Sequence, residues 1–168
     1  MIVRILGRKD TDAYKIAAET VEKCGCVLFD DSMYYVDPEI KIDLNIAPLL
    51  TEKIPNDVIH DARCGTLIFH PSPLPYGRGA SSIRWAYKRV EPVTAATWFW
   101  ADDGLDTGNI CEQEVVKILY EMKPKQFYES EILPAMKRTL KRCLNALSIG
   151  LKREIPQISK YATYDKKL

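Results

Sequence analysis

Short apolar runs rich in β-branched residues alternate with amphipathic segments of helical length through the first two thirds of this chain. Four early strands are expected, over residues 1–6, 26–29, 42–47 and 66–69. A helix is expected between the first two strands, from a cap at Asp10, Thr11 or Asp12 to about Lys23. A second, short helix is expected from Pro55. This alternation predicts an α/β domain with a mostly parallel sheet and helices on both faces.

The rest of the chain continues the pattern with longer elements. A helix over residues 83–90, capped by Ser81 or Ser82, is expected before strands over residues 93–100 and 108–118. A last helix is expected over residues 129–152, where apolar side chains recur at helical spacing and Pro134 falls near the start. No repeat or linker interrupts the 168 residues, so we expect a single domain over residues 1–168.

Two tryptophans lie two positions apart in the strand expected over residues 93–100. Trp98 and Trp100 therefore share one face of that strand. We expect both in the hydrophobic core rather than stacked on a ligand, because large aromatic side chains contribute most when they are buried.

Composition narrows the class of protein. The formal net charge of +1 gives no field that would attract nucleic acid or an acidic membrane surface. No stretch is apolar for the ~18 residues of a membrane-spanning helix, and the apolar run at residues 1–6 is too short for a signal peptide. We therefore expect a cytoplasmic protein with no nucleic-acid or membrane partner.

The five cysteines do not form a metal-binding or redox motif. Their number is odd, and the Cys24-Gly25-Cys26 spacing differs from that of a CxxC pair. Only two histidines are present as further ligands. We expect reduced thiols and no metal site.

The most informative stretch is the apolar run that ends on His70 and enters a loop rich in proline and glycine. An acidic glycine turn follows at residues 102–108. Both segments come directly after expected strands, and strand ends are where α/β proteins place their chemistry. His70 and Asp106 are thus candidates for an imidazole–carboxylate pair. Alternatively, His70 satisfies buried polar groups and Asp106 caps a turn.

These segments resemble the formyltransferase family that uses 10-formyltetrahydrofolate, which includes the glycinamide ribonucleotide, methionyl-tRNA and sugar N-formyltransferases. The pattern His-Pro-Ser-x-Leu-Pro-x-x-x-Gly matches residues 70–79, and Asp-x-Gly-x-Asp-Thr-Gly matches residues 102–108. The helix at residues 82–90 and the segment 156–164 also match. Two motifs in the right order make the resemblance specific.

The resemblance implies a Rossmann-like fold and formyl transfer from 10-formyltetrahydrofolate to a primary amine. It implies catalytic roles for His70 and Asp106. It also implies that the pteridine is contacted by Leu49, Leu50, Asp102, Asp103, Gly104 and Leu105. The amine acceptor, by the same resemblance, is contacted by Arg78 and Gly79. Alternatively, the leucines belong to the core, the two aspartates lie in a solvated turn, and Arg78 braces its loop.

One departure from the family bears on catalysis. The family has Asn-x-His, and its asparagine amide donates to the oxyanion, whereas Ile68 stands at that position here. Losing such a donor costs roughly two to three orders of magnitude in rate. Another donor replaces it, or turnover is slow, or turnover is lost. The possible replacements are Asn45, Ser81, Ser82, Asn109 and a loop N–H. A folate-binding module without turnover and a hydrolase of 10-formyltetrahydrofolate therefore remain as alternatives.

Further departures concern the acceptor. The half of the chain ahead of His70 is shorter than in familiar members, as if one strand–helix unit were missing. The Gly-Ser-Gly phosphate loop of the glycinamide enzyme is replaced by residues 7–10, Gly-Arg-Lys-Asp. The C-terminal barrel of the transfer-RNA enzyme has no counterpart, and the net charge is near zero. We expect a small amine as acceptor, for example an amino-sugar nucleotide.

Overall fold

The computed structural model describes residues 1–29, 38–50 and 52–168. Residues 30–37 lie outside the described residues; they are part of the stretch between the strands expected over residues 26–29 and 42–47, where the sequence predicts no element. The elements in chain order are β1 (Ile2–Ile5), α1 (Asp12–Lys23), β2 (Val27–Phe29), β3 (Leu44–Ala47), α2 (Asn56–Ile59), β4 (Thr66–His70), β5 (Arg78–Gly79), α3 (Ser82–Lys88), β6 (Val93–Trp100), β7 (Ile110–Lys117), α4 (Pro124–Phe127), a π-helix (Tyr128–Ile132), α5 (Leu133–Ser148), a 3-10 helix (Ser159–Tyr161) and β8 (Tyr164–Asp165).

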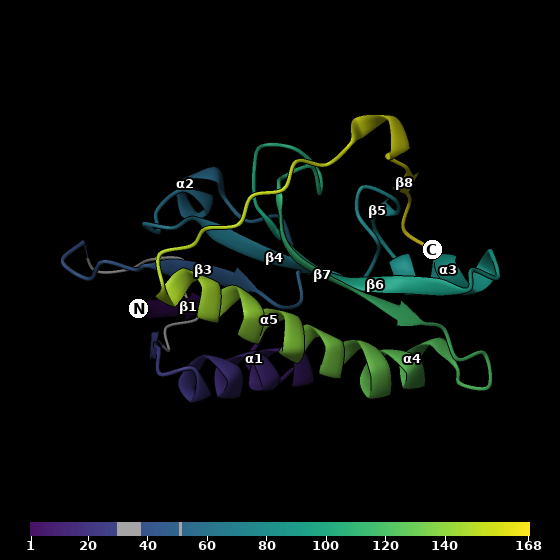
Figure 1. Ribbon diagram of the computed structural model, residues 1–168, viewed down its shortest axis with the longest axis horizontal. Coiled ribbons are helices and arrows are strands. Elements are labelled where there is room, and N and C mark those ends of the chain that lie inside the picture. The colour runs from purple at the N-terminus through teal and green to yellow at the C-terminus, as the bar shows by residue number, and fades with distance from the viewer. Residues whose placement is uncertain (30–37, 51) are drawn as a thin grey trace.

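A six-stranded sheet in the order β2-β1-β3-β4-β6-β7 runs through the molecule (Figure 1). The first four strands in that order are parallel, and β6 and β7 are antiparallel to their neighbours. The register pairs Ile68 with Phe99 and His70 with Thr97. The expected α/β fold with a mostly parallel sheet is confirmed.

The helices cover the two faces unequally. In Figure 1, α1 and α5 lie side by side below the sheet, and the short α2 lies above it. The larger core lies between the sheet and the α1–α5 pair. The Trp98 side chain is fully buried there and Trp100 nearly so, and their indole N–H groups donate to the Met136 and Arg153 carbonyls. The expectation that both tryptophans are core residues is confirmed.

The opposite face carries a smaller apolar cluster, made of Leu6, Ala47, Ile54, Val58, Ile59, Ile68, Leu74 and Phe99. It also contains a buried polar network around Arg4, which is fully buried in the sheet. The Arg4 guanidinium donates to Asp61 Oδ1 over 2.7 Å and to Asn45 Oδ1 over 2.9 Å. A charge on this thinly covered face is thus paired, as a buried charge must be.

Two helix expectations need correction. The last helix, expected over residues 129–152, ends at Ser148. Its helical structure also begins earlier, at Pro124, and passes through α4 and a π-helical turn over Tyr128–Ile132 before α5. Pro134 lacks an N–H, so it cannot complete the α-helical ladder just where the π-turn lies. Ser81 is at the N-cap of α3 as expected, but it is left-handed, with φ 60°, and its side chain makes no capping bond.

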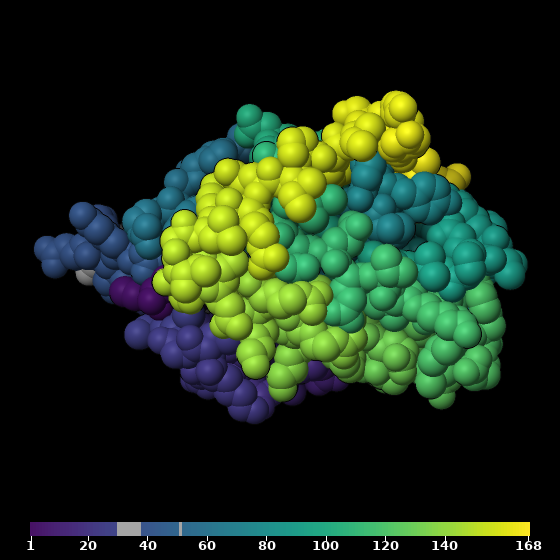
Figure 2. Space-filling view, viewed as in Figure 1, coloured from purple at the N-terminus to yellow at the C-terminus, as the bar shows by residue number. Residues whose placement is uncertain are grey.

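The segment after α5 returns across the molecule. It runs over the surface from the end of α5 towards α3, in yellow-green to yellow (Figure 2). Its last strand, β8, pairs in parallel with β5, so that Arg78 lies opposite Tyr164 and Gly79 opposite Asp165. This pairing joins the loop that follows His70 to the C-terminal segment, although the two are far apart in the sequence.

Several further expectations concern what the chain lacks. All five cysteines are free thiols. In the part of the chain that the structure describes, no cluster of three or more His, Cys, Asp or Glu side chains is placed to hold a metal ion. Over the same described ranges, no helix has the length and apolar character needed to cross a membrane.

We expect Arg4→Met to lower the free energy of unfolding by about 2 kcal/mol, because the buried Asn45 amide oxygen loses its donor, while Asp61, whose side chain is 33% exposed, is compensated in part by solvent. Urea denaturation followed by circular dichroism measures this. Arg8→Met is the matched control, since the Arg8–Asp10 pair is exposed and should contribute little. An equal effect of the two substitutions would show that the Arg4 network does not support the fold.

Candidate active site

Two adjoining cavities open on the thinly covered face of the sheet. The first, of about 680 Å³, lies at the carboxyl ends of β3 and β4 and is bounded by the start of α3 and the C-terminal segment. The second, of about 350 Å³, lies between α2 and the turn that follows β6. Residues that line both cavities mark where they meet: Leu50, Lys53, Ile68, Leu105 and Asp106.

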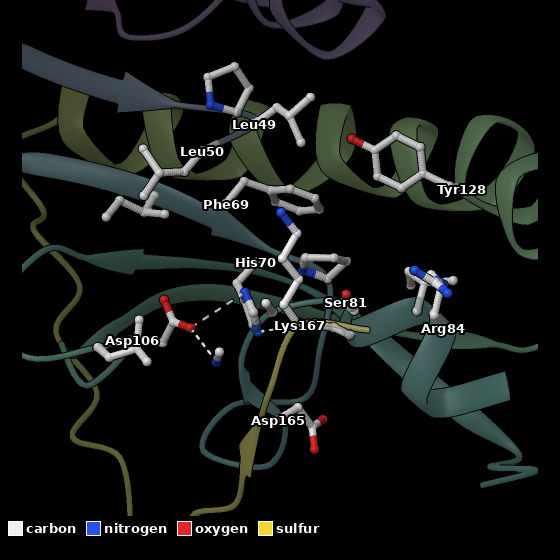
Figure 3. A pocket seen from close by; sticks show the side chains of 18 of the residues that line it. Leu49, Leu50, Phe69, His70, Ser81, Arg84, Asp106, Tyr128, Asp165 and Lys167 are labelled. Atoms are coloured by element: carbon white, nitrogen blue, oxygen red, sulfur yellow. Dashed lines mark hydrogen bonds and ion pairs between the residues drawn. The ribbon is translucent and has the colours of Figure 1, made fainter. Parts of the chain in front are cut away.

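His70 is the last residue of β4 and is only 7% exposed. Its Nε2 lies 2.7 Å from the Gly77 carbonyl oxygen and 3.1 Å from Ser82 Oγ. A carbonyl only accepts, so we assign a proton to Nε2. In the neutral imidazole, Nδ1 is then a free base. It lies 3.8 Å from Asp106 Oδ2 (Figure 3), so taking up a proton there forms an ion pair.

Asp106 reaches His70 because the turn after β6 folds back along the sheet. The antiparallel register places Trp100, at the end of β6, beside Leu67 at the start of β4. Gly108 permits the return, since a Cβ there would lie 1.6 Å from the Trp100 carbonyl oxygen. Asp106 itself has φ 55°, a left-handed conformation that is uncommon outside glycine. Its Oδ2 accepts a 2.7 Å hydrogen bond from Gly79 N–H, which joins the two motifs.

Arg78 is buried and does not line either cavity. Its guanidinium donates to Gln157 Oε1 over 2.8 Å and to the Tyr164 hydroxyl over 2.8 Å. These contacts correspond to the alternative in which Arg78 braces its loop. Gly79 does line the first cavity, and it must be glycine because a Cβ would lie 2.3 Å from the Asp165 carbonyl oxygen.

The residues expected around the pteridine gather at the cavities. Five of them line the second cavity: Leu50, Asp102, Asp103, Gly104 and Leu105. Leu49 lines the first. The Asp102 carboxylate accepts from Gly104 N–H and from the Thr107 hydroxyl, so its side chain shapes the turn and the turn backbone forms the cavity wall.

Most of the side chains expected to replace the asparagine amide either make hydrogen bonds to other groups or lie away from both cavities. The Asn45 amide nitrogen donates to the Val58 carbonyl, Asp61 and Thr66, and Asn45 lines neither cavity. Asn109 also lines neither. Ser81 Oγ accepts a bond from Leu168 N–H. Ser82 contacts His70.

Lys53 is a residue that the sequence patterns did not single out. Of the five residues that line both cavities, it alone has a side chain with an N–H donor. It lies in the loop between β3 and α2, where no motif marks it, and it is exposed. Ile68 also lines both cavities, so Lys53 and the residue that replaces the amide line the same junction.

Tyr128, in the π-helical turn, was also not anticipated. Its side chain points into the first cavity (Figure 3). The hydroxyl oxygen is buried and has no hydrogen-bond partner among the described residues. Burial raises the pKa of Tyr128 to about 12. A buried, unpartnered hydroxyl at a cavity wall is available to a ligand.

Comparisons with known proteins agree on one family. The formyl transferase family matches residues 7–141. Cytosolic 10-formyltetrahydrofolate dehydrogenase of Xenopus tropicalis is 34% identical over 126 residues, which cover 75% of this chain and 14% of that protein. The chain thus spans a small part of these relatives.

Solved structures show the same fold. HypX from Aquifex aeolicus in complex with tetrahydrofolic acid superposes with a TM-score of 0.81 at 21% identity, covering 99% of this chain and 29% of that one. The formyltransferase PseJ from Anoxybacillus kamchatkensis, in complex with UDP-4,6-dideoxy-4-formamido-L-AltNAc and tetrahydrofolate, gives 0.74 at 21% identity, covering 99% and 86%. The expected Rossmann-like formyltransferase fold is confirmed.

We expect the stability of the protein to fall between about pH 10 and pH 12 through Tyr128. The unfolded phenol loses its proton near pH 10, whereas the folded one holds it until about pH 12, so alkali favours unfolding in that window. The loss amounts to about 2 kcal/mol and should be absent in Tyr128→Phe. Urea denaturation of both proteins from pH 8 to 12 measures it. Parallel pH profiles would contradict a buried Tyr128 hydroxyl.

Proposed function

The chain belongs to the formyl transferase family, and on that premise we propose that it transfers a formyl group from 10-formyltetrahydrofolate to a primary amine of a small molecule. One observation carries the proposal. Two cavities meet beside His70, at Ile68 and Asp106, and two cavities are what two substrates need. A transfer between two molecules requires such a junction, because the reacting atoms must be held together.

The second cavity suits the folate. Its walls include the apolar side chains Ile54, Ile59 and Phe99, opposite the backbone of the turn at residues 102–106. Apolar walls facing a few polar backbone groups are the usual setting for a flat heteroaromatic ring. The folate supplies the formyl carbon, which would lie at the junction.

The chain's own residues provide base and charge stabilisation at the junction. The amine attacks the formyl carbon and must lose a proton as the new C–N bond forms and the bond to the folate nitrogen breaks. His70 Nδ1 is the free base that accepts this proton. Asp106, 3.8 Å away, stabilises the imidazolium that results. The proton then passes to the departing folate nitrogen.

Negative charge that develops on the formyl oxygen needs a donor. We assign this role to Lys53, because Ile68 has no donor and Lys53 lines both cavities. An ammonium group is a stronger donor than the neutral amide that it replaces. The substitution of isoleucine for asparagine is then compatible with turnover.

For the acceptor, two structural neighbours were solved with sugar nucleotides. PseJ holds a UDP-linked formamido sugar, and the N-formyltransferase from Helicobacter canadensis, with a TM-score of 0.75 at 16% identity over 99% of this chain and 71% of that one, holds folinic acid and dTDP-3-aminofucose. We propose an amine of the same kind, an amino-sugar nucleotide.

Hydrolysis of 10-formyltetrahydrofolate is the second candidate. Sequence relatives that are 34% identical are named dehydrogenases of 10-formyltetrahydrofolate, a name that includes the folate and no amine. In that case water takes the place of the amine in the first cavity, and His70 accepts its proton.

One assay separates these functions and tests the catalytic pair. The protein is incubated with 10-formyltetrahydrofolate alone and then with a panel of amines, and free tetrahydrofolate is measured. We expect release only with an amine. His70→Ala and Asp106→Ala should each lower the rate by at least 10²-fold, and the double variant should be little slower than either, because the two act as one unit.

Release without amine would establish the hydrolase instead. Saturable folate binding without release under any condition would leave a binding module. Near-wild-type rates in both single variants would show that the roles given to His70 and Asp106 are wrong.

The role of Lys53 has its own test. Lys53→Met should lower the rate of transfer by roughly 10²-fold, as expected for one oxyanion donor. Ile68→Asn should change the rate of the wild-type protein little but should recover much of the loss in the Lys53→Met background, because it restores an amide at the junction. Lys15→Met, on α1 across the sheet, is the control. A rate gain from Ile68→Asn alone would show that no donor occupies the junction.

A further inference from the structure

Lys167 reaches into the first cavity from the C-terminal segment. In Figure 3 its side chain extends from the strand at the edge of the site towards Phe69, across the region of His70. It makes no hydrogen bond or ion pair with a described residue. The proposed reaction gives this side chain no role, so its placement needs an explanation.

The backbone around Lys167 is held on both sides. Asp165 carbonyl accepts from Ala80 N–H over 2.9 Å, and the Lys166 carbonyl accepts from Trp85 Nε1 over 2.8 Å. Leu168 N–H donates to Ser81 Oγ over 3.1 Å. Because side chains alternate along an extended segment, Asp165 and Lys167 lie on the cavity side and Lys166 does not line the cavity. The backbone that carries Lys167 is thus held at the cavity rim, while its side chain is exposed and unpaired within the described part of the chain.

A second cation lines the same cavity. Arg84, on α3, lines the same cavity and uses only Nη1, which donates to the Leu168 carbonyl over 2.9 Å. The rest of its guanidinium has no partner among the described residues. Arginine presents several donors in one plane, a geometry suited to phosphate and carboxylate oxygens.

Three carboxylates also line this cavity, and two of them are committed. Asp165 is held by Arg89, with 3.1 Å between Nη1 and Oδ2. Asp106 accepts from Gly79 N–H and faces His70. Glu52 remains, on the loop that also carries Lys53. On the side formed by α3 and the C-terminal segment, Asp165 is thus paired with Arg89, and no carboxylate side chain of the described residues pairs with Lys167 or Arg84.

We propose that Lys167 and Arg84 form an anion subsite that binds a phosphate or carboxylate group carried by the acceptor. The inference rests on the proposed function only in calling the ligand an acceptor. Neither residue lines the second cavity, so the anion lies on the side of His70 away from the folate. The unpartnered Tyr128 hydroxyl in the same cavity is a further donor for it.

The subsite selects acceptors by charge. An anion on the acceptor fixes its position relative to His70, and binding energy from a group remote from the reacting atoms is what orients the amine. Neutral amines of the same size would bind without this contact and react from fewer productive orientations.

Anion binding can be measured without turnover. ¹⁵N-labelled protein is titrated with inorganic pyrophosphate and, separately, with acetate, and the amide shifts of residues 81–84 and 165–168 are followed. We expect saturable shifts with pyrophosphate if the anion is a phosphate, or with acetate if it is a carboxylate. Lys167→Met should weaken that binding at least tenfold.

Lys166→Met is the matched control, because it removes the same charge from the adjacent residue without altering the cavity wall. Equal weakening by both lysine variants, or no saturable shift with either anion, would overturn the subsite. In the transfer assay, Lys167→Met should lower kcat/KM for anionic amines and leave kcat/KM for neutral amines of the same size unchanged.

The two proposals fail differently. Saturable anion binding that depends on Lys167, together with no amine-dependent release of tetrahydrofolate, supports the subsite and contradicts formyl transfer. Amine-dependent release with no dependence on Lys167 supports formyl transfer and overturns the subsite.

Discussion

A single hydrogen bond, from Gly79 N–H to Asp106 Oδ2, joins the two segments on which the site depends. It links the loop after β4 to the turn after β6, whose strand runs in the opposite direction. Without that link, Asp106 has no reason to remain beside His70, because the end of β6 lies at the other end of β4. The left-handed backbone of Asp106 costs energy that this bond and the packing of Gly108 against Trp100 offset.

The face of the sheet that carries the site is thinly covered, and this creates the cavities. Among the helices that the structure describes, only the short α2 lies over its strands, and the Arg4–Asp61–Asn45 network fills part of that face with polar groups. That network also holds the Asn45 amide away from both cavities. The junction of the cavities instead receives a lysine from a loop, and the rim receives another from the C-terminal segment.

The sequence alone determined the class of fold, the positions of most elements and the pair at the centre of the site. Periodicity located β4 and β6, because buried strands need uninterrupted apolar runs, and Thr11 marked the start of α1 because its hydroxyl caps Tyr14 N–H. The family motifs then identified His70 and Asp106. Periodicity did not predict the π-helical turn over Tyr128–Ile132, near Pro134, or the helix that begins at Pro124.

Only the tertiary structure decided which polar residues line the cavities. Lys53, Tyr128 and Lys167 carry no local signal, because each gains its place from elements distant in sequence. Arg78 shows the converse: a charged residue inside a motif is turned away to hold Gln157 and Tyr164. Local patterns determine backbone conformation over a few residues, whereas the direction of a side chain relative to a cavity depends on long-range strand pairing and on the return of the chain over its own surface.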